Sequence, residues 1–256
     1  MVVCSTVHVA VLSKAMDKCS SCCEEPRSNV NGQPYSHIEI SNATKVTKEA
    51  LDSVMTSKHF SPFVSIMISA LAQAGCPIDP NKHIVIEQCH LEDQVFGGFD
   101  PENNQIVLCE NKFVELSRTK DKNILIIMDQ LLSHELVHAY DFCRADIDFY
   151  SKPEHVMCSE IRAATLSGEC MFERQKARAV SVGLKEFHQK CVRQAALRSF
   201  KALHGNFSMY QSQSILNKVF SSCYIDTDPF DKIPFSKKQA DISYRAFLIR
   251  NRYSVF

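Results

Sequence analysis

Two histidines and a glutamate are closely spaced within an apolar stretch of the sequence. Residues 134 to 138 read His-Glu-Leu-Val-His. In a helix, histidines at positions i and i+4 lie one turn apart on the same face, and both can reach one zinc ion at about 2 Å. The glutamate between them lies beside that ion, where it can accept a proton from the attacking water. The spacing therefore predicts a Zn²⁺ site with His134 and His138 as ligands and Glu135 as the catalytic residue.

The segment around this motif is predicted to be a buried helix. At 100° per residue, His134, His138 and Asp141 fall on one narrow stripe. The opposite stripe is apolar and contains Met128, Leu132, Leu136 and Ala139. The same five-residue pattern occurs by chance in roughly one random chain of this length in a hundred, mostly on surface helices. Burying these polar groups is costly unless something satisfies them, and a zinc ion does so. The apolar surroundings thus favour a metal site.

Two carboxylates are candidates for the third protein ligand that a catalytic zinc usually has. Asp141 shares the stripe, but it lies about 10 Å along the helix axis from His134, so we expect it to orient a ligand imidazole instead. Glu160 follows His138 by 22 residues, enough for a loop and a second helix. The residues that share its helical face are small: Ala163, Ala164, Ser167 and Gly168. Because small residues let two helices approach closely, Glu160 is the preferred ligand and Asp141 the alternative.

The remaining pattern predicts an α+β fold. Two strand-like runs, residues 83–89 and 105–109, flank a turn-rich stretch at 96–104, which indicates a hairpin or small antiparallel sheet. Everything after residue 123 is mainly helical in pattern. A small sheet followed by a helical half, with the two histidines on one buried helix and a glutamate on the next, matches the layout of thermolysin-like zincins.

Globular patterning begins near residue 46, which predicts a poorly ordered segment at 1–45 and a single metalloprotease domain at 46–256. Cys19, Cys22 and Cys23 lie in the first segment. They could supply half of a zinc site, but no second pair lies nearby, so we interpret them as part of the tail.

The charge balance and the cysteine content restrict the class of protein. The chain has 256 residues, with 29 Lys and Arg against 29 Asp and Glu, so it lacks the basic excess of a nucleic-acid binder. Its most apolar stretch, residues 63–72, is about half of the roughly 20 residues that a membrane span needs. Twelve cysteines without a recognisable secretory signal indicate an oxidising compartment that is reached in another way. By elimination, we expect the mitochondrial intermembrane space.

Eight cysteines fall in the predicted globular part: Cys76, Cys89, Cys109, Cys143, Cys158, Cys170, Cys191 and Cys223. An even number allows four disulfides, but the sequence does not determine their pairing. The alternative is a set of buried free thiols. The expected compartment favours disulfides.

Several motifs together resemble one known family. They are residues 134–144 and 158–170, with Ser61-Pro-Phe-Val, Gly97-Gly-Phe-Asp, Ile106-Val-Leu-Cys, His188-Gln-Lys-Cys-Val-Arg and Asp228-Pro-Phe. The chain resembles the mitochondrial inner-membrane metalloprotease and ATP-synthase assembly-factor family over about residues 50–235. By position, His134 and His138 match its metal ligands and Glu135 its catalytic glutamate. The family also leads us to expect a cysteine near Cys89, where Ile86 stands.

The resemblance implies a peripheral protein on the intermembrane-space side of the inner membrane. It implies a protease that processes the precursor of an ATP synthase membrane subunit and also assists the assembly of that subunit. Two alternatives remain open. One is a non-proteolytic assembly chaperone with a structural metal site. The other is a nuclear DNA-repair partner, because some family members are named for binding the Ku protein.

For peptide hydrolysis, we expect the substrate to lie extended along an edge strand, and residues 105–108 are the candidate. A group that stabilises the developing oxyanion is also expected. Tyr140, Tyr150 and His155 are candidates for that role.

Overall fold

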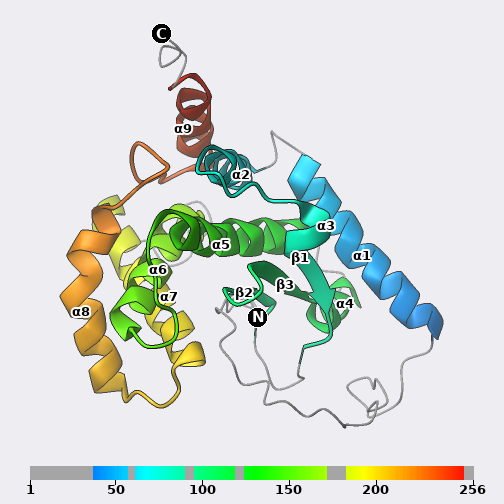
Figure 1. Cartoon of the computed structure of the whole chain (residues 1–256), viewed down its shortest axis with the longest axis horizontal. Helices are drawn as coiled ribbons and strands as arrows, with labels where there is room; N and C mark the ends of the chain where they lie inside the picture. Colours follow the sequence, from blue (N-terminus) through cyan, green and yellow to red (C-terminus); the bar gives the residue numbers. More distant parts are fainter. Residues whose placement is uncertain (1–36, 57–60, 90–94, 119–123, 172–182, 251–256) are drawn as a thin grey trace.

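The computed structural model describes residues 37–56, 61–89, 95–118, 124–171 and 183–250 (Figure 1). Along the chain the elements are α1 (His37–Thr56), α2 (Pro62–Gln73), α3 (Pro80–His83), β1 (Ile84–Glu87), β2 (Gly97–Asp100), β3 (Gln105–Cys109), α4 (Glu110–Arg118), α5 (Ile124–Arg144), α6 (Pro153–Leu166), α7 (Leu184–Leu203), α8 (Met209–Ile225) and α9 (Lys237–Ile249). The predicted α+β class, a small sheet before a mainly helical half, is confirmed.

The first described helix overlaps the end of the predicted N-terminal segment. Helix α1 begins at His37, inside the segment 1–45 that we expected to be poorly ordered. Residues 1–36, which include Cys19, Cys22 and Cys23, lie outside the described residues.

The sheet is mixed, with the strand order β1-β3-β2. Strand β2 pairs antiparallel with β3, and Gly97 lies opposite Leu108. Strand β1 pairs parallel with β3, and Ile84 lies opposite Ile106. The antiparallel pairing expected between the two predicted strands is therefore wrong. The turn-rich stretch itself contains β2, and the tight turn after Asp100, where Glu102 N–H donates to Asp100 Oδ1 at 2.9 Å, closes the β2–β3 hairpin instead.

This topology also corrects the predicted substrate-binding edge. Residues 105–108 belong to β3, which is the central strand and is hydrogen-bonded on both sides. Within the described residues, β2 is the outer strand on the side of α5. A Cβ added at Gly97 would lie 2.2 Å from the Val107 carbonyl oxygen and 3.2 Å from the Leu131 side chain. The glycine thus allows β2 to approach β3 and α5 closely.

Helix α5 runs through the middle of the molecule and is buried over most of its length. It packs against α2 on one side, against the sheet on another and against α6 (Figure 1). Met128, Leu131 and Leu136 on different faces of α5 are all fully buried. A helix that is apolar nearly all round needs such burial, so the prediction of a buried helix at this position is confirmed.

The eight cysteines of the globular part form four disulfides. The pairs are Cys76–Cys143, Cys89–Cys109, Cys158–Cys223 and Cys170–Cys191. The expected disulfides are present. Cys89 pairs with Cys109 in β3, so its disulfide does not involve position 86. The Cys158–Cys223 bridge joins α6 to α8, and the Cys170–Cys191 bridge joins the residues just after α6 to α7. These two disulfides link the helices of the helical half covalently.

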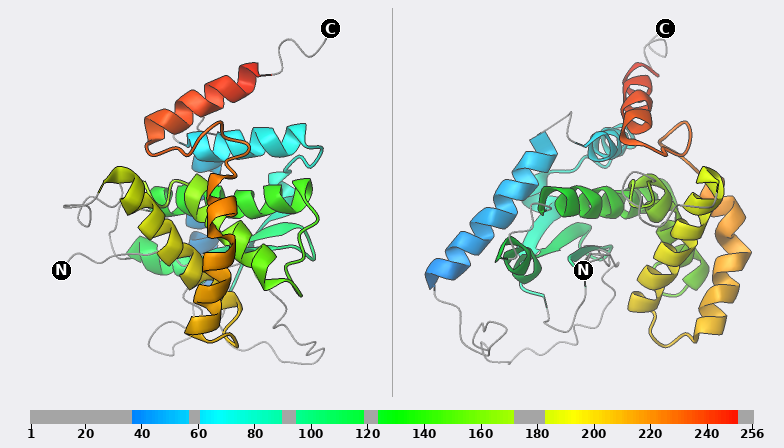
Figure 2. Two further views of the ribbon diagram at one scale, coloured as in Figure 1. Left: turned by 90° about the vertical axis from the view of Figure 1, so that its left-hand side faces the viewer. Right: turned by 180° about the vertical axis from the view of Figure 1, so that it is seen from behind.

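The last described helix projects from the rest of the molecule. Helix α9 lies across α2 and packs against it (Figure 2). In the described part of the chain, no helix is long and apolar enough to cross a membrane.

Candidate metal centre

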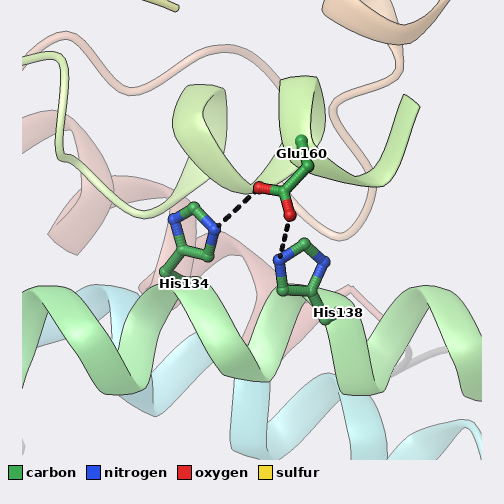
Figure 3. A group of neighbouring side chains, drawn as sticks. All are labelled: His134, His138 and Glu160. Atoms are coloured by element: carbon green, nitrogen blue, oxygen red, sulfur yellow. Dashed lines mark hydrogen bonds and ion pairs between the residues drawn. The ribbon is translucent and has the colours of Figure 1, made fainter. Parts of the chain in front are cut away.

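Three side chains from two helices converge on one point. His134 and His138 extend from α5, and Glu160 extends from α6 (Figure 3). Glu160 Oε2 lies 3.3 Å from His134 Nε2, and Glu160 Oε1 lies 3.7 Å from His138 Nε2. One ligand atom from each of the three residues lies within 4.8 Å of the others. The structure thus brings together the three residues that the sequence singles out as metal ligands.

The close approach of α6 to α5 follows from its sequence. Pro153 at the first position of α6 suits a helix start, because a proline there loses no helical hydrogen bond. Helix α6 then packs against α5, α7 and α8. Its buried side chains include Ala163 and Ala164, both fully inaccessible to solvent. Side chains this small let the helix backbones come near enough for Glu160 to reach the histidines.

Several buried polar atoms at this point have no hydrogen-bond partner in the protein. They are His134 Nδ1, His138 Nε2, Glu160 Oε1 and both carboxylate oxygens of Glu135. Leaving such atoms unsatisfied is costly, and native proteins rarely do so. A divalent cation between the two imidazoles and Glu160 would satisfy Nε2 and Oε1. Two imidazoles with one carboxylate are a donor set that suits zinc. The residues present therefore fit a metal ion.

His138 is oriented by a chain of hydrogen bonds. Its Nδ1 lies 2.7 Å from Ser159 Oγ, and that hydroxyl donates to Asp141 Oδ2 at 3.1 Å. Arg162 Nε donates to the same carboxylate at 2.8 Å. Because the Ser159 hydroxyl donates its proton to Asp141, its oxygen is the acceptor for the proton on His138 Nδ1. With the ring proton on Nδ1, Nε2 keeps its lone pair for a metal.

Asp141 therefore lies behind the site, as the helix geometry predicts, and not among the three converging ligand atoms. The sequence predicts that Asp141 orients a ligand imidazole, and in the structure Ser159 lies between Asp141 and the His138 ring. No pattern in the sequence marks Ser159, apart from its position next to Glu160.

Glu135 is fully buried beside the two histidines. Burial raises the pKa of its carboxyl group well above the usual value; the charge of Glu160 adds to this effect, while His134 and the backbone of Phe99 in β2 oppose it. A carboxylate with a raised pKa is a better base near neutral pH. The position and the electrostatics of Glu135 both suit a group that takes up and releases a proton.

The two imidazoles differ in charge. Burial alone would lower the pKa of His134, but the nearby carboxylates of Glu160 and Glu169 outweigh it and raise the pKa to about 10. Burial and the nearby charge of His134 lower the pKa of His138. Burial raises the pKa of Glu160. In the absence of a cation, a proton on His134 thus offsets part of the negative charge of this buried cluster.

The three candidates for stabilising an oxyanion have other contacts. The Tyr140 hydroxyl donates to Asp228 Oδ2 at 2.5 Å, which fixes the segment after α8. His155, in the first turn of α6, accepts at Nδ1 from the backbone N–H of Asp148 in the loop between α5 and α6, at 3.2 Å. Tyr150 is exposed on that loop. The hydrogen bonds of Tyr140 and His155 thus do not involve the converging ligands.

The sequence reasoning missed one acidic residue at this centre. Glu169 Oε2 lies 3.6 Å from His134 Nδ1. It lies beyond the end of α6, where helical spacing gives no information. The preceding residue, Gly168, is the one feature of the sequence that points to Glu169. A glycine after a helix often marks a turn that changes the direction of the chain.

Comparisons with known proteins agree with this geometry. The model of the Peptidase M76 family matches residues 45–231. A Xenopus laevis protein named mitochondrial inner membrane protease ATP23 homolog is 39% identical over 193 residues, which cover 75% of this chain and 77% of that protein. The Homo sapiens protein of the same name is 35% identical over 233 residues, 91% of this chain and 89% of that protein. An Aspergillus niger protein named mitochondrial inner membrane protease atp23 is 32% identical over 195 residues, 76% and 77% of the two chains. No solved structure matches the chain significantly.

Proposed function

Because the chain belongs to the Peptidase M76 family, whose members are metallopeptidases, we propose that it is a zinc-dependent endopeptidase with its metal held by His134, His138 and Glu160. The observation that best supports this proposal is the buried convergence of two imidazole Nε2 atoms on one carboxylate. Glu160 Oε1 and His138 Nε2 have no other partner in the protein.

Glu135 is the proposed catalytic residue. A bound zinc ion supplies Lewis acidity, which polarises a carbonyl group and lowers the pKa of water to near neutrality. Glu135 accepts a proton at its carboxylate from the attacking water and then delivers it to the leaving amine. Its burial beside the two histidines supports both transfers. Ser159 keeps the His138 ring in one orientation during these steps.

The substrate is proposed to bind as an extended strand along β2. Main-chain pairing with an outer strand selects an extended conformation more than a sequence. Strand β2 packs against α5, and the backbone of its Phe99 lies close enough to Glu135 to affect its pKa. A peptide beside β2 would therefore run past the catalytic glutamate.

The proposed location is the intermembrane-space side of the mitochondrial inner membrane. The Xenopus laevis and Homo sapiens relatives are named as proteases of the mitochondrial inner membrane. The four disulfides support an oxidising compartment and count against a nuclear DNA-repair partner, which would be kept reduced. In line with the resemblance, the proposed substrate is the precursor of an ATP synthase membrane subunit, whose assembly the protein also assists.

Peripheral attachment to the membrane is proposed to involve α9. Ala240, Ser243 and Phe247 form its buried face. The opposite face exposes large apolar side chains, with Ile242 at 52%, Leu248 at 53% and Ile249 at 50%. Lys238 and Arg245 are exposed on the same side of the helix, and Arg245 also pairs with Asp241 at 2.9 Å. Apolar and cationic side chains on one helix face are typical of helices that lie on an anionic lipid surface.

The function is tested by comparing zinc content and peptide cleavage in three purified proteins. The wild type is expected to hold one zinc per chain and to cleave an unfolded protein substrate. Glu135→Gln should keep the zinc and lose cleavage by a factor of about 10² or more, because it removes the proton acceptor. Glu160→Ala should lose or greatly weaken zinc binding.

If Glu135→Gln still cleaves the substrate, Glu135 is not the catalytic residue. A folded wild type without metal or cleavage would favour the assembly chaperone. If Glu135→Gln loses cleavage but still supports assembly of the ATP synthase, the two roles are separate.

A further inference from the structure

Glu169 reaches back toward the metal centre from beyond the end of α6. Its Oε2 lies 3.6 Å from His134 Nδ1, and its Oε1 lies 3.7 Å from Nη2 of Arg198 on α7. The His134 ring is 98% buried, and its Nδ1 has no hydrogen-bond partner within normal distance. A shift of a few tenths of an ångström would bring the carboxylate to hydrogen-bond distance from that atom.

The backbone, and not the ion pair with Arg198, sets the position of Glu169. Gly168 has φ = +76°, and a Cβ added there would lie 2.7 Å from the ring of Phe63. Only glycine therefore fits this turn. The next residue, Cys170, is fixed to Cys191 on α7 by a disulfide. Glu169 is thus held on both sides, by a tight turn before it and a covalent bond after it.

The two histidines then have equivalent surroundings. His138 is held at Nδ1 by Ser159, with Asp141 behind it. We propose that Glu169 is a positioning residue that holds His134 at Nδ1, so that both Nε2 atoms face Glu160 and the metal position. A carboxylate in this place fixes the ring orientation and makes the imidazole a more basic ligand. This inference rests on the proposed metallopeptidase function.

A purely structural role for Glu169 makes a different prediction. In that case its partner is Arg198, and the pair only ties the turn after α6 to α7. Arg198→Gln removes this pair and leaves Glu169 beside His134. Glu169→Ala removes both contacts, whereas Glu169→Gln keeps the side-chain shape and one acceptor oxygen. These variants separate positioning of His134 from bracing of the turn.

The test is the zinc affinity of the full-length metal-free chain, measured by competition with a chromogenic chelator. Loss of an outer partner typically weakens metal binding by about 10–100-fold. We expect Glu169→Ala near the upper end, Glu169→Gln near the lower end, and Arg198→Gln close to the wild type. With Co²⁺ in place of zinc, the visible spectrum should change in the Glu169 variants and not in Arg198→Gln.

Wild-type affinity in both Glu169 variants would overturn the inference, and so would an equal loss in Arg198→Gln. A wild type that binds neither Zn²⁺ nor Co²⁺ would overturn the proposed function itself. Thermal unfolding of the metal-free proteins identifies a variant that fails to fold, and Glu169→Gln, which preserves volume, then decides the question.

Discussion

At the scale of single residues, Ser159 connects the metal centre to the buried charges behind it. Its hydroxyl lies between His138 Nδ1 and the Asp141 carboxylate. Ser159→Ala would leave that imidazole proton without its acceptor and free the ring to turn. We expect zinc affinity to fall by about 10–100-fold, which chelator competition would measure.

The chain offers a matched control for this variant. Ser133 is also buried, next to His134, but its hydroxyl donates only to the Asp129 backbone carbonyl of its own helix at 2.6 Å. Ser133→Ala should leave zinc affinity near that of the wild type. Equal losses in the two variants would mean that packing around α5, and not the Ser159 contact, determines the affinity.

The residues that the sequence identified are those whose role depends on helical spacing. His134, Glu135 and His138 lie on one helix, so a fixed rotation per residue relates them. Glu160 was found from its spacing and from the small residues on its face. Ser159 and Glu169 contribute through a tertiary hydrogen bond and a turn, and neither leaves a periodic pattern in the sequence.

At the scale of elements, α7 contains a titratable group that the catalytic proposal does not use. His188 is buried, and its Nδ1 lies 2.9 Å from the Tyr224 hydroxyl on α8. Burial lowers the pKa of His188 to about 4. The unfolded chain therefore takes up a proton near pH 6.5, whereas the folded chain takes it up only near pH 4.

His188 is thus expected to reduce stability as the pH falls. Above about pH 6.5 His188 is neutral in both the folded and the unfolded chain, so it does not change the free energy of unfolding. Between pH 6.5 and 4 only the unfolded chain binds the proton, and the free energy of unfolding falls by about 3 kcal/mol at most. His188→Gln keeps a hydrogen-bonding group that does not titrate. Urea unfolding at several pH values should show a flatter decline for this variant in that window. Parallel curves for both proteins would show that His188 does not titrate as its burial implies.

Strand pairing was the element-scale feature that the sequence did not determine. The turn signals after Asp100 predict a hairpin, but the one strand-like run that the pattern shows before them is 83–89, so the sequence assigns the wrong partner to residues 105–109. Strand β2 is short and contains two glycines, so it lacked the β-branched pattern by which strands are usually identified. The pairing of β1 parallel to β3 depends on contacts between distant residues, which local patterns do not encode.

At the scale of the whole molecule, the disulfides connect the metal centre to the helical half. The Cys158–Cys223 bridge joins α6 to α8 and lies next to Ser159 and Glu160. Replacing both cysteines with serine should lower the free energy of unfolding by about 2–4 kcal/mol. Chemical denaturation of the metal-free protein would measure this loss. An unchanged free energy would mean that packing alone holds α6 against α8.

The outer face of α9 gives a whole-molecule prediction about the membrane. Replacing Ile242, Leu248 and Ile249 with serine removes apolar surface that would enter a lipid interface, and binding to anionic vesicles should fall by at least about tenfold. Wild-type binding should also weaken with added salt, because Lys238 and Arg245 act through screened charges. Co-sedimentation with vesicles that contain or lack anionic lipid would measure both effects.

Helix α8 supplies the control for this experiment. Met209 and Tyr210 are also large and exposed, at 60% and 84%, but they lie at the start of α8 and not on α9. Their replacement with serine should leave vesicle binding unchanged if the attachment is specific to α9. Equal losses of vesicle binding in the two sets of variants would indicate that exposed apolar side chains bind lipid nonspecifically, wherever they lie on the surface. Cleavage of a soluble peptide should stay the same in both sets of variants, because neither set contacts the metal centre. Loss of vesicle binding without loss of cleavage would therefore separate membrane attachment from catalysis.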